Sequence, residues 1–170
     1  MGNLEIALPV LSIWLLVVVL LYRRFRRAAA DVPWVCHAAA AVALSLGVGT
    51  VIAGVGHSVA VASLGLSERE YGPLQILRFT TGAMLVYAGA MNAALYRAIK
   101  VGRRPAIAAG AATALLFALY LLFLLPLPGT GGTVPPMLGL WSFYLLWLGA
   151  AAVTSMRGVG GARQRFDPRA

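Results

Sequence analysis

The sequence contains five long apolar runs, and no other feature limits the fold as strongly. A helix that crosses the hydrocarbon core of a bilayer needs about 20 mostly apolar residues. The runs reach about that length and cover residues 4–22, 33–66, 74–96, 105–126 and 136–156. We therefore predict an all-α, polytopic membrane protein built as a bundle of about five transmembrane helices.

The composition supports a bilayer as the solvent. Only 11% of the residues are charged and 61% are hydrophobic, whereas a soluble domain has about 25% charged residues. The chain therefore has too few polar side chains to cover a soluble globule. We predict one transmembrane helical domain over residues 1–156. The Gly- and Arg-rich segment 157–170 is expected to be a mobile basic cytoplasmic tail.

Lys and Arg residues flank the apolar runs asymmetrically. They follow the first run, separate the third from the fourth and occupy the C-terminal tail: Arg23, Arg24, Arg26, Arg27, Arg97, Lys100, Arg103, Arg104, Arg157, Arg163, Arg165 and Arg169. With five spans all of these lie on one side, and only Arg69 and Arg78 fall on or near the other. The positive-inside rule then predicts a cell membrane protein with its N-terminus outside and its C-terminus cytoplasmic. This placement also argues against nucleic acid as a partner, despite a net charge of +9.

The second apolar run is too long for one simple span. Residues 33–66 would extend about 50 Å as a helix, against a hydrocarbon core of about 30 Å. Because Gly weakens a helix interior, we expect a break or bend near Gly54 and Gly56, with 58–66 lying along the outer interface.

The second and third runs are also rich in small residues, which allow helix backbones to approach closely in lipid. We predict that these two helices form the packed centre of the bundle through Gly47, Gly49, Ala53, Gly54, Gly56, Gly82, Ala83, Gly89 and Ala90. The first and fourth runs contain bulkier side chains and are expected to face lipid.

The segment between the second and third runs gathers most of the polar chemistry. It contains His57, Glu68 and Tyr71, and Arg78 enters the next apolar run. An ionisable residue inside an apolar run is a candidate functional residue. These side chains form a candidate outer pocket for a lipid- or quinone-like ligand, in which His57 and Arg78 bind a phosphate, a carboxylate or a quinone headgroup. The alternative is a polar cap between two helices, with Arg78 snorkelling to the headgroups.

Two further features concern polar groups within the spans. Asn92 lies deep in the third run, where we expect an interhelical hydrogen bond or, alternatively, a ligand contact. His37 and His57 suggest haem, but twenty residues of helix would place them about 30 Å apart. One chain could not clamp one haem with both, so haem would require a second subunit. The single cysteine excludes an intramolecular disulfide and a multi-cysteine metal site.

The sequence contains no recognisable catalytic set: no H-E-x-x-H, no G-x-S-x-G and no acidic residue in the middle of a span. We predict a non-catalytic subunit of a membrane complex or homo-oligomer, in contact with membrane lipid and without a metal or other cofactor. The first alternative is a small-solute or ion transporter or channel that uses Asn92, Thr80 and Thr81. The second is a haem-bearing redox subunit or membrane enzyme that uses His57 and Arg78.

Overall fold

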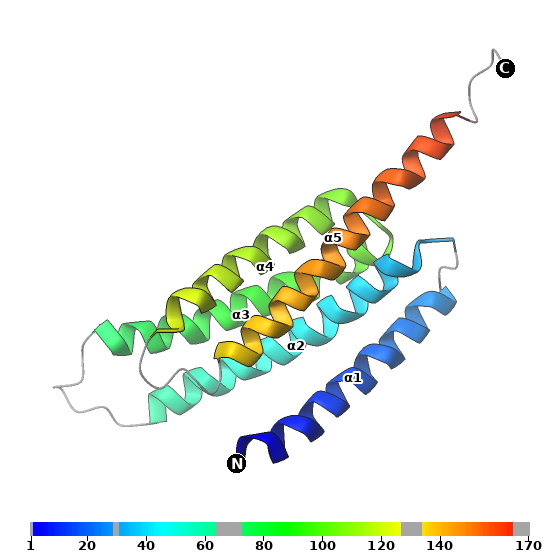
Figure 1. Ribbon diagram of the computed structural model, residues 1–170. Coiled ribbons are helices and arrows are strands. Elements are labelled where there is room, and N and C mark those ends of the chain that lie inside the picture. Colours follow the sequence, from blue (N-terminus) through cyan, green and yellow to red (C-terminus); the bar gives the residue numbers. More distant parts are fainter. Residues whose placement is uncertain (1, 29–30, 64–72, 127–133, 165–170) are drawn as a thin grey trace.

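The computed structural model consists of five helices in the described part of the chain (Figure 1). They are α1 (Gly2–Ala28), α2 (Trp34–Ser63), α3 (Pro73–Lys100), α4 (Arg104–Leu124) and α5 (Val134–Gln164). The structure describes the chain except for residues 1, 29–30, 64–72, 127–133 and 165–170. Within the helices, the side chains of residues 2–8, 10, 63, 73–76, 78, 79 and 157–164 also lie outside the description. The predicted all-α class and number of helices are confirmed.

Three of the five helices are long and apolar enough to cross a membrane: α2 over Trp34–Ala62, α4 over Arg104–Leu124 and α5 over Val134–Met156. This supports a multi-pass membrane protein. In the described residues α1 and α3 are not among these helices, so five spans and the orientation of the termini remain predictions.

Helices α2 and α3 make the most extensive helix pair of the bundle. A Cβ atom added to Gly47 would lie 2.7 Å from the carbonyl oxygen of Gly89, and one added to Gly89 would lie 2.5 Å from that of Gly47. A Cβ atom added to Gly54 would lie 2.9 Å from the carbonyl oxygen of Gly82. These backbones can approach only because neither helix has a side chain at the contact. The predicted packed centre is confirmed at these four glycines.

The remaining small residues of the predicted interface are placed differently. A Cβ atom added to Gly49 or Gly56 would meet no atom within 4 Å, and Ala53, Ala83 and Ala90 are exposed. The prediction that they pack between α2 and α3 was therefore wrong. The reason is angular: positions seven residues apart, such as 47 and 54, return to the same helix face, whereas 49, 53 and 56 lie on others.

The expected break in α2 is absent, because one helix runs unbroken from Trp34 to Ser63. Gly54, which suggested the break, serves the close contact with α3 instead. The proposed interfacial segment is helical through Ser63, and the rest of it lies outside the described residues. As a helix of 30 residues, α2 is about 45 Å long and must tilt or protrude from a bilayer. Helix α5 likewise continues to Gln164, past the span end predicted at residue 156, and extends beyond the bundle (Figure 1).

Helices α4 and α5 pack through aromatic side chains. Trp141, Tyr144, Leu148 and Ala151 form a buried stripe on α5 at helical spacing. The Trp141 ring meets Phe117 of α4 edge-on, with 4.8 Å between the ring centroids. This stripe fixes α5 against α4.

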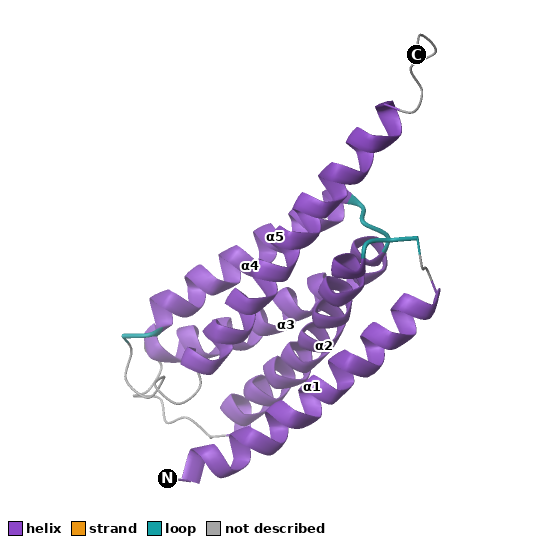
Figure 2. Ribbon diagram, turned by 45° about the vertical axis from the view of Figure 1, so that its right-hand side comes forward, coloured by secondary structure: helices purple, strands orange, loops and turns teal. Residues whose placement is uncertain are grey.

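Helix α1 lies at the edge of the bundle, along α2 (Figures 1 and 2). Most of its large apolar side chains between residues 11 and 20 are exposed, and α4 also exposes several, among them Leu116 and Phe123. These faces are apolar where a soluble protein would be polar, as expected for helices that contact lipid.

Candidate functional site

The residues predicted to form an outer pocket are only partly described. Glu68 and Tyr71 lie outside the described residues, and for Arg78 only the backbone position in α3 is given. His57 lies on α2 and is half-buried. A site shared by His57 and Arg78 therefore remains a prediction.

Asn92 is completely buried on α3, and both of its polar atoms are hydrogen-bonded. Its Nδ2 donates to the carbonyl oxygen of Ala88 at 2.8 Å, and its Oδ1 accepts from the Tyr144 hydroxyl of α5 at 2.7 Å. Gly110 of α4 covers the pair: a Cβ atom there would lie 3.3 Å from the Tyr144 hydroxyl oxygen. The expected interhelical hydrogen bond of Asn92 is present, and it joins α3 to α5 where α4 packs against them at Gly110.

The arrangement of the histidines bears on the haem alternative. His37 is buried near the start of α2, whereas His57 lies near its end. Because α2 is one continuous helix, it cannot fold back to bring them together, and their separation stays at about 30 Å. In the described residues no three His, Cys, Asp or Glu side chains form a group able to hold a metal ion.

An apolar hollow lies between α1, α2 and α5. Its volume is about 620 Å³, which falls within the range of about 300–1,000 Å³ for small-molecule sites. The lining residues are Leu11 and Trp14 of α1, Ser45, Leu46, Gly49, Thr50 and Ala53 of α2, and Pro136, Met137, Gly139 and Leu140 of α5. We call this the α1/α2/α5 cavity.

The helix contacts explain why the cavity exists. Helices α1 and α5 both pack on α2, but contacts between α1 and α5 are few. The α2 surface between them carries small residues, and a Cβ atom added to Gly49 on α2 or Gly139 on α5 would meet nothing within 4 Å. Two helices thus form the walls and α2 forms the floor.

The chemistry of the cavity is almost entirely apolar. Its two hydroxyl groups donate to carbonyl oxygens of their own helix: Ser45 to Val42 at 3.2 Å and Thr50 to Leu46 at 2.6 Å. The indole Nε1 of Trp14 is buried and has no hydrogen-bond partner among the described residues. None of the described residues that line the cavity has a titratable side chain. An occupant of the cavity would therefore be held by its apolar surface.

Sequence reasoning did not find this cavity. Gly49 and Ala53 were noticed as small residues but assigned to helix packing, and Gly139 and Trp14 gave no separate signal. A hollow between helices depends on which helices are neighbours, and the apolar runs do not encode that order locally.

The fold is all-α with five helices in the described residues, and three of them are long and apolar enough to cross a membrane. Searches of protein-family models, curated proteins and solved structures found no significant match to the chain.

Proposed function

We propose that this protein is a non-catalytic membrane subunit that holds an apolar lipid chain in the α1/α2/α5 cavity. The observation that carries the proposal is the cavity itself, about 620 Å³ in volume and lined by apolar side chains. An apolar cavity is not stably filled by water, because water needs polar partners. In a bilayer the solvent that can fill it is a hydrocarbon chain, either acyl or isoprenoid.

The position of the cavity supports a lipid occupant. Its lining residues come from the first half of α1, the middle of α2 and the first turns of α5. These stretches lie away from the end of the bundle where the arginines gather, and so within its apolar part. With the predicted orientation, the cavity opens in the outer half of the bilayer. A quinone-like ligand agrees with this position, since its isoprenoid tail is apolar.

The non-catalytic assignment rests on two observations: no titratable side chain is among the described residues that line the cavity, and the Ser45 and Thr50 hydroxyls donate to carbonyl oxygens of their own helix. Transport is less well supported. Asn92, which only the transporter alternative placed along a solute path, is fully buried and hydrogen-bonded on both polar atoms. The Thr81 hydroxyl donates to the Leu77 carbonyl oxygen and pairs with the Tyr120 hydroxyl. We also propose that the subunit works in a homo-oligomer or with other membrane subunits, since several of its helices expose large apolar side chains.

The test is to fill the cavity. We expect Gly49→Phe combined with Gly139→Phe to lower the amount of lipid bound per protein at least about tenfold, which corresponds to about 1.4 kcal/mol. The protein is purified from its native membrane in mild detergent, and co-purifying lipids, quinones and proteins are quantified by mass spectrometry. Stable stoichiometric protein partners would support the subunit role.

The chain offers a matched control. Gly56 on α2 and Gly149 on α5 also face open space, but neither lines the cavity. The double variant Gly56→Phe, Gly149→Phe adds the same two rings to the same two helices and should keep the bound lipid. Equal lipid retention in both double variants would overturn the proposal. A colourless, partner-free protein with transport activity in proteoliposomes would favour the transporter instead.

A further inference from the structure

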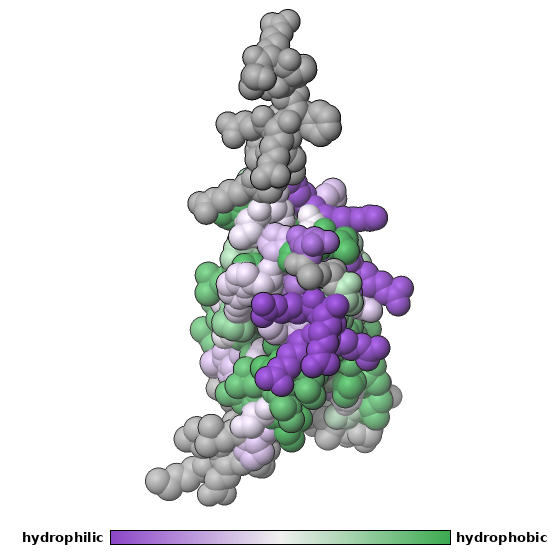
Figure 3. All heavy atoms as spheres, turned by 90° about the vertical axis from the view of Figure 1, so that its right-hand side faces the viewer, coloured by the Kyte–Doolittle hydropathy of each residue, from purple (hydrophilic) through white to green (hydrophobic). Residues whose placement is uncertain are grey.

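Every charged side chain that the structure describes lies at one end of the bundle. All except Asp31 are basic: Arg23, Arg24, Arg26, Arg27, Arg97, Lys100, Arg103 and Arg104. Figure 3 looks toward this end and shows hydrophilic side chains gathered among apolar ones. The contacts agree, because the Lys100 ammonium lies 5.2 Å from the Phe25 ring centroid and Arg104 donates to the carbonyl oxygen of Ser155. The end is thus a basic surface assembled from several helices.

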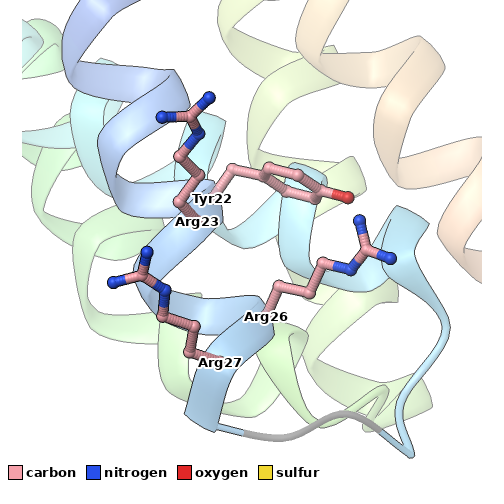
Figure 4. Close-up of a pocket in the computed structure, with 4 residues that line it drawn as sticks. All are labelled: Tyr22, Arg23, Arg26 and Arg27. Carbon is pink, nitrogen blue, oxygen red and sulfur yellow. The ribbon is translucent and has the colours of Figure 1, made fainter.

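Part of this surface is a pocket on the last turns of α1. It has a volume of about 490 Å³ and is lined by Tyr22, Arg23, Arg26 and Arg27. Figure 4 shows Tyr22 and Arg26 extending to one side of the helix, while Arg23 and Arg27 extend to the other. The two residues within each pair are four positions apart in the sequence, so they lie on the same helix face. We call these four residues the arginine pocket.

The arginine pocket lacks a counter-charge. Within the described part of the chain, none of its guanidinium groups forms an ion pair or a hydrogen bond with the protein. Like charges four residues apart destabilise a helix by about 0.2–0.5 kcal/mol per pair. Placement at a helix C-terminus offsets some of this repulsion. An anion between the guanidinium groups would remove it, so the pocket is electrostatically suited to an anionic ligand.

The pocket is held in place by its neighbour Phe25. This side chain is buried and stacks on Tyr96 of α3, with 5.7 Å between the ring centroids. The Lys100 ammonium also lies over the Phe25 ring, 5.2 Å from its centroid. Phe25 therefore fixes the rotation of α1 about its axis and determines the directions in which Arg23, Arg26 and Arg27 extend.

We propose that the arginine pocket binds the phosphate of an anionic membrane lipid. Guanidinium groups bind phosphate through two parallel N–H···O bonds, and a Tyr hydroxyl can donate a further bond. The sequence of α1 places the pocket at the level of the lipid headgroups, because the exposed apolar residues Leu16, Val19 and Leu20 come directly before it. Basic residues just beyond an apolar span are attracted to anionic headgroups.

A lipid fits this pocket better than a soluble anion does. All four lining residues come from α1, which is at the edge of the bundle, so the pocket is reached sideways from the surrounding leaflet. The apolar face of α1 lies beside the acyl chains of a lipid whose phosphate is bound there. This site and the α1/α2/α5 cavity are separate, and neither proposal depends on the other.

The experiment uses the full chain in nanodiscs of equimolar phosphatidylglycerol and phosphatidylcholine. The protein is extracted in mild detergent, and the ratio of the two retained lipids is measured by mass spectrometry. We expect phosphatidylglycerol to be retained at least tenfold over phosphatidylcholine. Arg23→Gln combined with Arg27→Gln should abolish the preference, and Arg23→Lys with Arg27→Lys should restore only part of it.

The matched control removes the same charge elsewhere on the basic surface. Arg103→Gln combined with Arg104→Gln leaves the arginine pocket and the Tyr96 ring that supports Phe25 unchanged, and should lower the preference less than threefold. Equal losses in the two Gln double variants would overturn the assignment, because they would indicate general surface charge. Displacement of the lipid by inorganic phosphate alone would also overturn it, since the pocket would then recognise a free anion. All four exchanged arginines are exposed, so the variants should fold, and protection of the buried Cys36 thiol checks this.

Discussion

The two sides of α2 use the same residue type in opposite ways. On the side that faces α3, Gly47 and Gly54 allow backbone contact, and an added Cβ atom would lie within 3 Å of α3 backbone atoms. On the side that faces α1 and α5, Gly49 leaves a hollow, and an added Cβ atom would touch nothing. We call these the packed side and the open side.

The difference teaches that a glycine-rich membrane helix cannot be interpreted from composition. In lipid, helices associate through close packing rather than through a hydrophobic driving force. The packed side meets that requirement and anchors the bundle. The open side forgoes contacts that larger residues could have made, which is the arrangement expected if another molecule supplies them.

The largest effect is expected on the packed side. Gly89→Ala places a Cβ atom 2.5 Å from the Gly47 carbonyl oxygen and 2.8 Å from the Val51 nitrogen. Both are backbone atoms and cannot move without separating the helices, so we expect a loss of about 2–3 kcal/mol in stability. Thermal unfolding in detergent measures it through a thiol-reactive fluorophore, because the only cysteine, Cys36, is fully buried. A melting temperature equal to that of the wild type would refute the packed side as described.

A smaller effect is expected at the buried hydrogen bond between Asn92 of α3 and Tyr144 of α5. Tyr144→Phe removes the hydroxyl that donates to Asn92 Oδ1 and leaves that oxygen buried without its donor. We expect a loss of about 0.6–1.7 kcal/mol in stability, the range from the average to the maximum measured for interhelical hydrogen bonds in a membrane protein. A double-mutant cycle with Asn92→Leu, followed by the same Cys36 assay, isolates the bond. Additive single effects would show that the two residues do not stabilise the fold through each other.

The sequence was sufficient for the features that depend on length and charge. The apolar runs predicted all five helices, and the positions of the Lys and Arg residues predicted a common basic end, to which the described ones belong. The richness of the second and third runs in small residues also predicted the α2–α3 pair. Each of these follows from local pattern and the geometry of one helix.

The features that depend on how the helices are arranged could not be predicted. Whether Gly54 breaks α2 or packs it against α3 is decided by Gly82 and Leu85 on another helix. The cavity requires α1 and α5 to sit on the same side of α2 without touching closely, and no residue pattern in either run specifies that. The proposed pairing of His57 with Arg78 depends on the connection between α2 and α3. A sequence pattern cannot test it, whereas substitution of the two residues can.

The smallest effect is expected on the open side, and its sign differs from that of the other two. Gly49→Ala adds a methyl group that meets nothing within 4 Å, while Ala is favoured over Gly in a helix interior by about 0.5–1 kcal/mol. We therefore expect the variant to be as stable as the wild type or more stable by about that amount in the Cys36 assay. Its direct comparison is Gly89→Ala, which makes the identical chemical change on the partner helix of the packed side. If both variants lose stability equally, the hollow beside Gly49 is closed in the folded protein, and the α1/α2/α5 cavity could not hold a lipid chain.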